Sequence, residues 1–128
     1  MRLLLDTHVF IWLNSEPQRL SAGFRQLCQS GEHEFFLSMA SPWEMQIKQQ
    51  LGKLSLQVPL DELIGKNVEQ NAIRLLGIDF KHICHLASLP LHHNDPFDRI
   101  ILAQALTEDL TIVTADRAFS AYEASLFW

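Results

Sequence analysis

Four acidic residues, spread over a sequence of 128, stand where a parallel α/β protein gathers its ligand-binding side chains. Asp6 directly follows the apolar run Leu-Leu-Leu, and Asp116 follows Ile-Val-Thr-Ala. Glu44 and Asp98 lie in the first turns of two expected helices. Because the carboxyl ends of parallel strands and the loops after them share one edge of the sheet, we expect the four carboxylates to converge.

Converging carboxylates predict a site for a divalent cation. Like charges repel one another and lose hydration when they are buried, so a cluster of acids is costly without a counter-charge. Oxygen ligands suit Mg²⁺ or Mn²⁺, and such ions usually keep several waters and are completed by the phosphates of a substrate. The residue types therefore indicate metal-assisted chemistry on a phosphate ester.

Helix capping explains each of these acids equally well when it is taken alone. Two segments match the capping-box pattern, Ser-Pro-Trp-Glu at 41–44 and Asp-Pro-Phe-Asp at 95–98. Ser41 and Asp95 are the expected N-caps, each followed by proline at the first helical position and an acid at the third. An Asp after a strand is likewise a common N-cap. Only the joint placement of the four acids favours a site over capping.

Basic residues accompany three of the acids. Lys48 lies one helical turn after Glu44, so it either holds a substrate phosphate or pairs with that carboxylate. Arg99 and Arg117 each directly follow one of the acids. This position makes both arginines candidates to contact a substrate or to neutralise the cluster.

Histidines and aromatic residues near the acids have simpler interpretations. Zinc or iron would use imidazole together with carboxylates, but adjacent residues such as His92 and His93 point to opposite sides of an extended chain. We therefore expect no histidine ligand, and for His8 we expect a packing or hydrogen-bonding role. Four aromatic residues are expected in the core rather than as surfaces on which bases stack: Phe10, Trp12, Trp43 and Phe97.

The elements that must position the acids alternate along the chain. Apolar or β-branched runs predict strands at 2–5, 34–37, 74–78 and 111–113, with a further edge strand at 126–128. Helical spacing, caps and terminating glycines predict helices at 7–13, 21–30, 41–52, 60–72, 81–87 and 95–108, and a helical turn at 117–122. This alternation predicts a three-layer α/β/α fold with a central, mostly parallel sheet, in one domain over residues 1–128.

Composition narrows the class of protein further. The formal net charge of −5 argues against a broad basic face for nucleic acid. Cys28 and Cys84 lack metal-ligand spacing and are expected to be buried thiols. No apolar run is long enough to cross a membrane, and Asp6 interrupts the apolar start that would suit a signal peptide. We therefore expect a cytoplasmic protein.

Four motifs, in order along nearly the whole chain, resemble one family. They are Leu-Leu-Leu-Asp-Thr-His at 3–8, Leu-Ser-Met-Ala-Ser-Pro-Trp-Glu-Met at 37–45, His-His-Asn-Asp-Pro-Phe-Asp-Arg at 92–99, and Ile-Val-Thr-Ala-Asp at 112–116. The chain resembles PIN-domain ribonucleases, and among them the VapC-like toxins of bacterial type II toxin–antitoxin modules. Together the four motifs are specific, although a single Asp-Thr would not be.

The resemblance implies a function and a site. The acidic metal ligands of the family fall on Asp6, Glu44, Asp98 and Asp116, with Mg²⁺ or Mn²⁺ as the cofactor. It implies hydrolysis of RNA phosphodiester bonds to a 5′-phosphate and a 3′-hydroxyl, in a structured RNA such as a transfer RNA. It also implies inhibition by a cognate antitoxin that reaches the acids, and a homodimer for which helices 7–13 and 60–76 offer apolar residues.

Two further residues have open roles under this resemblance. Asp95 is either an outer ligand or only a helix cap. Thr114 either hydrogen-bonds an acid or a metal-bound water, or stands there for its β-propensity.

Two alternatives to a nuclease remain at this point. One is a PIN-like module that binds RNA or protein without catalysis, but such modules typically lack some of the acids, and all four are present here. The other is a metal-dependent phosphatase of the haloacid-dehalogenase type. That class needs a second Asp two residues after the first, and His8 occupies this position.

Overall fold

A five-stranded parallel sheet forms the centre of the protein. The computed structural model describes all residues from 1 to 128, and the sheet has the strand order β3-β2-β1-β4-β5 with every neighbouring pair parallel. The strands are β1 (Arg2–Leu5), β2 (Glu34–Ser38), β3 (Ile73–Leu76), β4 (Thr111–Val113) and β5 (Leu126–Phe127). The predicted edge strand at the C-terminus is thus confirmed, and no strand is antiparallel.

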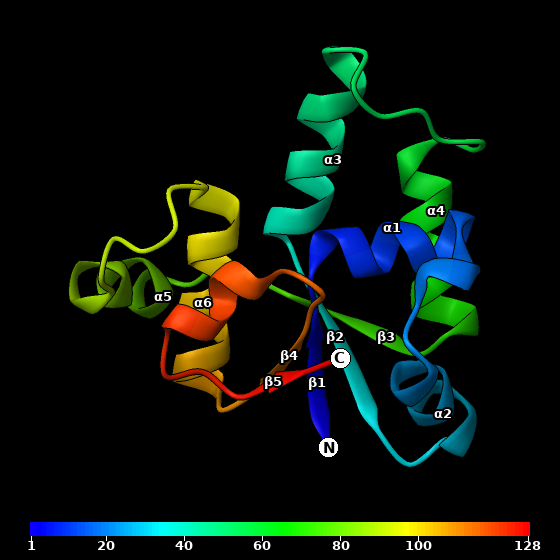
Figure 1. The fold of residues 1–128 in the computed structure, drawn as a ribbon. Coiled ribbons are helices and arrows are strands. Elements are labelled where there is room, and N and C mark those ends of the chain that lie inside the picture. Colours follow the sequence, from blue (N-terminus) through cyan, green and yellow to red (C-terminus); the bar gives the residue numbers. More distant parts are fainter.

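Helices cover both faces of this sheet (Figure 1). They are α1 (Thr7–Ser15), α2 (Ala22–Ser30), α3 (Ala40–Gln50), α4 (Leu60–Gln70), α5 (Phe80–His85) and α6 (Pro96–Glu108). Short 3-10 turns follow at Pro17–Arg19, Leu86–Ser88 and Arg117–Ala121. The predicted helical turn at the last of these positions is therefore a 3-10 turn.

Two apolar clusters, one on each face, hold the three layers together. Leu4 of β1 packs with Ile101 of α6 on one face. Its neighbours Leu3 and Leu5 point to the other face, where they pack with Phe10 of α1 and the helices α2 and α4. This alternation along a strand buried on both faces is what the uninterrupted run of leucines requires. The three-layer α/β/α fold is confirmed.

The strand order reverses next to β1. The chain moves from β1 to β2 and β3 on one side, and then returns to place β4 and β5 on the other. In open parallel sheets, the crevice beyond the carboxyl ends of the strands at such a reversal is the usual ligand site. In Figure 1 the starts of α1 and α3 meet at this end of the sheet.

Helix α3 begins differently from the prediction. It starts at Ala40, so Ser41 is not its N-cap, and Glu44 does not stand in a capping box. Only Met39 separates β2 from α3, and this N-cap residue makes no side-chain capping hydrogen bond. The hydroxyl of Ser38, one residue earlier, accepts the Ala40 N–H at 3.0 Å. The buried Ser41 hydroxyl instead hydrogen-bonds Thr7 at 2.8 Å, which ties α3 to α1.

Helix α6 begins as predicted, with one difference. Asp95 is its N-cap and accepts the backbone N–H groups of Phe97 and Asp98 at 2.8 and 3.1 Å. The second hydrogen bond of the predicted capping box, from the Asp95 N–H to the Asp98 side chain, is absent. The Asp95 N–H instead donates to Nδ1 of His93 at 3.2 Å. The Asp98 side chain is therefore not used for capping.

Two other expectations about burial are wrong. Cys28 and Cys84 are free but exposed, because they lie on the solvent sides of α2 and α5, where polar neighbours follow them in sequence. Trp43 is 59% exposed rather than in the core. Phe10, in contrast, is completely buried as predicted.

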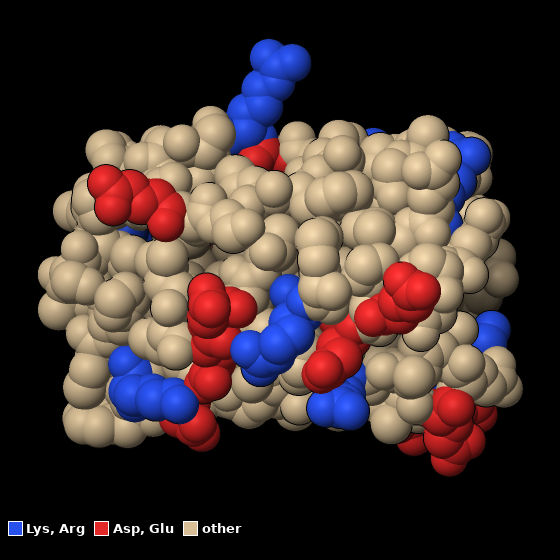
Figure 2. Space-filling view, turned by 90° about the horizontal axis from the view of Figure 1, so that it is seen from below, with Lys and Arg blue, Asp and Glu red and all other residues tan.

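The surface at the amino ends of the strands carries both signs of charge. Figure 2 shows this face, with basic and acidic side chains interspersed and no continuous patch of either sign. Arg74 pairs with Glu34 at 3.3 Å across β3 and β2, and Arg2 donates to the carbonyl of Glu108.

None of the helices has both the length and the apolar composition to cross a membrane.

Candidate metal centre

Asp6, Glu44, Asp98 and Asp116, which we call the acid quartet, come from four elements at the carboxyl edge of the sheet. Asp6 lies between β1 and α1, and Asp116 begins the 3-10 turn after β4. Glu44 is in the second turn of α3 and Asp98 in the first turn of α6. The convergence expected from a parallel sheet is what positions these side chains together.

Helix capping accounts for only one member of the quartet. Asp116 caps its 3-10 turn by accepting the Ala118 N–H at 2.9 Å. Asp6 stands at the N-cap of α1, but its side chain makes no capping hydrogen bond. Glu44 and Asp98 take no part in a capping box. Three of the four carboxylates are therefore free for another role.

Asp6 and Glu44 are deeply buried, with 3% and 4% of their surface exposed. One oxygen of each has a partner, since the Thr114 hydroxyl donates to Oδ2 of Asp6 and Lys48 Nζ pairs with Oε2 of Glu44, both at 2.8 Å. The other oxygens, Oδ1 of Asp6 and Oε1 of Glu44, are buried without any partner. A buried polar atom without a partner typically costs about 1–3 kcal/mol, which a cation bound at these oxygens would remove.

The electrostatics of the quartet point the same way. Burial, together with the negative charges of Asp6, Asp95, Glu44 and Asp116, raises the pKa of Asp98 to about 8. Burial also raises the pKa of Asp6, although the hydrogen bond from Thr114 and the nearby His8 oppose this shift. A set of acids that resists full ionisation without a counter-charge fits a divalent cation, because a cation favours the ionised forms.

His93 is a member of this cluster that the sequence reasoning missed. Its Nε2 lies 3.0 Å from Oδ2 of Asp98 and 3.5 Å from Oδ2 of Asp116. The neighbouring His92 points elsewhere and packs edge-on against Tyr122 with a centroid distance of 5.2 Å. The expectation that the two histidines point apart is thus met. The available signal was that His93 precedes the cap residue Asp95 by only two positions.

Of the three basic residues named from the sequence, Lys48 and Arg117 lie beside the quartet and Arg99 does not. Lys48 pairs with Glu44, and this hydrogen bond raises the pKa of the lysine. Arg117 is exposed beside Asp116 and makes no ion pair. Arg99 does not join the quartet, because its guanidinium donates to the carbonyls of the segment 86–90 and to Tyr122. We correct its expected role to that of a brace for this segment.

An aromatic pair, the exposed Trp43 and the partly buried Phe97, adjoins two quartet residues. Trp43 precedes Glu44, and Phe97 precedes Asp98. Their rings pack edge to face with centroids 5.0 Å apart and an interplanar angle of 87°. The pair connects the first turns of α3 and α6, so it braces the two helices that carry these acids.

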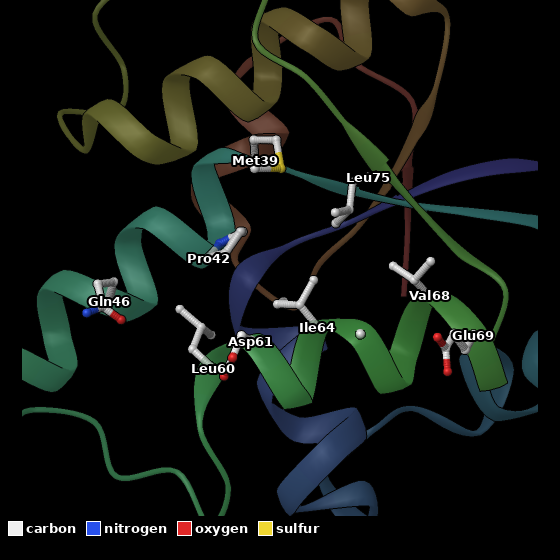
Figure 3. Close-up of a pocket in the computed structure, with 10 residues that line it drawn as sticks. Met39, Pro42, Gln46, Leu60, Asp61, Ile64, Val68, Glu69 and Leu75 are labelled. Atoms are coloured by element: carbon white, nitrogen blue, oxygen red, sulfur yellow. The ribbon is translucent and has the colours of Figure 1, made fainter.

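The largest hollow of the surface lies away from the quartet. It is a groove of about 720 Å³ between α3, α4 and the edge strand β3 (Figure 3). Met39, Val68 and Leu75 line it and are each about two-fifths exposed. Asp61 and Glu69 stand along α4 at its border, and no residue of the quartet lines it. The groove is therefore a separate surface with an apolar floor.

The fold and the site together define a class: a parallel α/β protein with a carboxylate cluster at the point where its strand order reverses. The chain belongs to the PIN domain family, whose family model matches residues 3–124. The resemblance seen in the four sequence motifs is thereby confirmed.

Comparisons with individual proteins agree with this assignment. Ribonuclease VapC22 of Mycobacterium tuberculosis is 29% identical over 121 residues, which cover 94% of this chain and 91% of that protein. The fold is similar to that in the crystal structure of VapBC2 from Rickettsia felis bound to a DNA fragment, with a TM-score of 0.73, 16% identity, and coverage of 99% and 98% of the two chains. A DNA-bound VapBC from Salmonella typhimurium gives a TM-score of 0.70 at 15% identity, with 99% and 97% covered.

Proposed function

We propose that this PIN-domain protein is a metal-dependent endoribonuclease that uses Mg²⁺ or Mn²⁺ held by Asp6, Glu44, Asp98 and Asp116. The observation that carries the proposal is the pair of buried carboxylate oxygens, on Asp6 and Glu44, that have no partner. The raised pKa of Asp98 supports it, as does the similarity to a protein named a ribonuclease.

The residues of the chain would divide the work between them. When bound, such an ion supplies Lewis acidity, which stabilises charge on phosphate oxygens and makes water easier to deprotonate. Thr114 orients Asp6, and Lys48 orients Glu44 while offering a positive charge to the phosphate. Water adds to phosphorus and the bond to the 3′-oxygen breaks, which leaves a 5′-phosphate and a 3′-hydroxyl. Arg117 adds an exposed positive charge beside Asp116.

Substitution of single quartet residues tests this proposal. Asp6→Asn or Asp98→Asn should abolish Mg²⁺-dependent RNA cleavage while circular dichroism stays that of the folded protein. Asp109→Asn is a matched control, because Asp109 is an exposed acid at the far end of α6 with a left-handed backbone that Asn tolerates. Retained cleavage in a folded Asp98→Asn protein would contradict the proposed site.

The second candidate is a module that binds RNA or protein without catalysis. We keep it because a net charge of −5 is unusual for an enzyme that acts on RNA. It predicts no uptake of Mn²⁺ in a calorimetric titration, whereas the nuclease predicts a site that Asp98→Asn removes. The phosphatase alternative is weaker, because His8 is exposed where that class needs a second acid.

We propose a structured RNA, such as a transfer RNA, as the substrate. The net charge of −5 argues against a broad basic surface for long, non-specific RNA. Positive charge next to the site is limited to Lys48 and Arg117, which suits a small footprint. RNA substrates of this kind place the proposed action in the cytoplasm. Sequencing of RNA ends after brief expression of the wild type or Asp98→Asn identifies the cut; dispersed ends would contradict a single structured target.

We further propose that the chain acts as the toxin of a toxin–antitoxin pair. Similar folds occur in structures described as VapBC and as a toxin-antitoxin complex from Klebsiella pneumoniae. A small cognate antitoxin would inhibit by placing a basic residue near the quartet, where the acids supply its counter-charge. Expression should arrest growth, and co-expression of the product of a short adjacent gene should relieve the arrest. Absence of toxicity would contradict the toxin role but not the nuclease.

We also propose a homodimer, with the groove of Figure 3 as the surface through which two copies meet. Of the two helices expected to supply apolar residues, α1 has Val9 and Phe10 buried in the core. Helix α4 keeps Val68 exposed, with Met39 of α3 and Leu75 of β3 beside it. The more exposed apolar surface for association is that of α4 and its neighbours.

A further inference from the structure

His93 is held rigidly at the quartet by groups that otherwise have no part in the proposed function. Its backbone N–H donates to the hydroxyl of Tyr122 at 2.9 Å, and that hydroxyl donates to the carbonyl of Pro90 at 2.8 Å. Its ring packs against Phe119 with a centroid distance of 5.8 Å. Its Nδ1 accepts the Asp95 N–H at 3.2 Å. Both the main chain and the ring are thus fixed in place.

The contact at Nδ1 determines what the other ring nitrogen can do. A nitrogen that accepts a hydrogen bond carries no proton, so in the neutral ring the proton is on Nε2. This Nε2–H points into the cluster, 3.0 Å from Asp98 and 3.5 Å from Asp116. The nitrogen is buried, and it is aligned with neither oxygen well enough for a single hydrogen bond. It therefore stands between the two carboxylates.

Asp116 is the quartet residue that most needs such a contact. It lies on a short 3-10 turn, its side chain is 44% exposed, and its Oδ1 is used to cap that turn. The Asp98 side chain, from another element, accepts no hydrogen bond, and the Nε2 of His93 is a close polar contact of it at 3.0 Å. Both carboxylates must be ionised to hold a cation, and like charges on separate elements then repel each other unless a group stands between them.

We propose that His93 is a positioning residue of the metal centre: its Nε2–H spans Asp98 and Asp116 and keeps these carboxylates at the spacing that the ion requires. This inference rests on the proposed function. His93 presents this N–H to both carboxylates without a well-aligned hydrogen bond to either, and it does not act as a metal ligand. Groups that hold ligands in this way typically contribute 10–100-fold to metal affinity.

Metal ligation by His93 is the competing role, and the fold disfavours it. Ligation through Nε2 would move the proton to Nδ1, where it would face the Asp95 N–H. That N–H cannot turn away, because Asp95 is fixed as the N-cap of α6 through its bonds to Phe97 and Asp98. Ligation would therefore leave two donors facing each other.

The tautomer of His93 can be measured on the wild-type protein. In ¹⁵N–¹H long-range spectra of protein labelled with ¹⁵N-histidine, at a pH where the ring is neutral, we expect the Nε2–H tautomer both without metal and with saturating Mg²⁺. His93→Gln identifies the resonances. A switch to the Nδ1–H tautomer when Mg²⁺ is added would overturn the donor role in favour of ligation.

Calorimetric titration with Mn²⁺ tests the effect on the site. We expect His93→Ala to weaken Mn²⁺ binding by about 10–100-fold, and His93→Gln, whose amide N–H reaches similarly far, to recover most of it. His92→Ala is the matched control and should bind as the wild type does. Unchanged affinity in His93→Ala would overturn the inference but leave the nuclease standing. Absence of Mn²⁺ binding by the wild type would overturn both.

Discussion

At the scale of single residues, the proposed site is a local cost to the stability of the metal-free protein. Asp98 is ionised only with difficulty, because it is largely buried among three other acids and Asp95. Asp6 and Glu44 keep an unpartnered oxygen each. Folding therefore assembles charges that repel each other, and this repulsion is acceptable where a bound cation or a proton relieves it.

Removal of the Asp98 charge should stabilise the metal-free protein. Its pKa rises from 3.8 to about 8 on folding, so at pH 7.5 Asp98→Asn should raise the free energy of unfolding by on the order of 5 kcal/mol. Urea denaturation in the presence of EDTA measures this. The same substitution should lower the stability gained from Mn²⁺. A less stable metal-free Asp98→Asn protein would show that the acid does not carry this cost.

The same group predicts how stability depends on pH. Between about pH 4 and 8 the folded protein holds a proton on Asp98 that the unfolded chain has released, so the stability of the metal-free protein falls as pH rises through this range. Below pH 4 Asp98 is protonated in both the folded and the unfolded state, so its burial no longer lowers the free energy of unfolding. Urea denaturation at pH 5.5, 6.5, 7.5 and 8.5 with EDTA should show this fall for the wild type and a flatter profile for Asp98→Asn. Parallel profiles would contradict the shift.

At the scale of elements, the sequence predicted the existence and the order of the strands and helices, but not all of their ends. The apolar runs, and the acids that follow them, were sufficient to predict which segments are strands. A sheet that is buried on both faces leaves a continuous apolar pattern in each of its strands. The first residue of α3 could not be predicted from the capping pattern at 41–44. The cap position depends on how few residues join β2 to α3, and this is set by the sheet and not by the sequence around Ser41.

The candidate site shows the same division. The convergence of the acid quartet followed from topology, so it could be predicted. The contact of His93 could not, because it depends on the path of the segment 89–95 over Phe119 and Tyr122 and on the cap at Asp95. The Arg99 side chain was misassigned for a related reason. Its position beside Asp98 in sequence places it about 100° around the helix, where backbone carbonyls and not the acids meet it.

Two substitutions of Asp95 distinguish its role as the N-cap of α6 from the effect of its negative charge. Asp95→Ala removes an acceptor for two backbone N–H groups and should lower the free energy of unfolding by about 1 kcal/mol. Asp95→Asn keeps the acceptor and removes one charge that acts on Asp98, so it should be nearly neutral or stabilising without metal. Thermal and urea denaturation of both variants measure the difference. Equal destabilisation by Ala and Asn would mean that the charge, and not the cap, is what the fold uses.

At the scale of the whole molecule, charge and apolar surface are placed on different sides of α3. Glu44 and Lys48 lie on the side of α3 that faces the quartet, whereas Met39 and Gln46 face the groove of Figure 3. Helix α3 thus separates the proposed site of chemistry from the proposed surface for a second copy. Association through the groove would leave the quartet open to RNA, so the two proposals are compatible and can be tested independently.

The oligomeric state tests the groove directly. Two copies that bury Val68 and Leu75 should sediment at twice the 14.7 kDa mass of the chain, and Val68→Lys should shift this equilibrium to the monomer, because the ammonium group would lose hydration in an apolar interface. Leu91→Lys is the matched control, since Leu91 is an exposed apolar residue outside the groove. Sedimentation equilibrium between 1 and 100 µM measures both variants against the wild type. Because none of the quartet lines the groove, Mn²⁺ affinity should be the same in all three proteins. A wild type that stays monomeric at the highest concentration, or a Val68→Lys protein that still dimerises, would mean that the apolar floor of the groove is not where two copies of this chain meet.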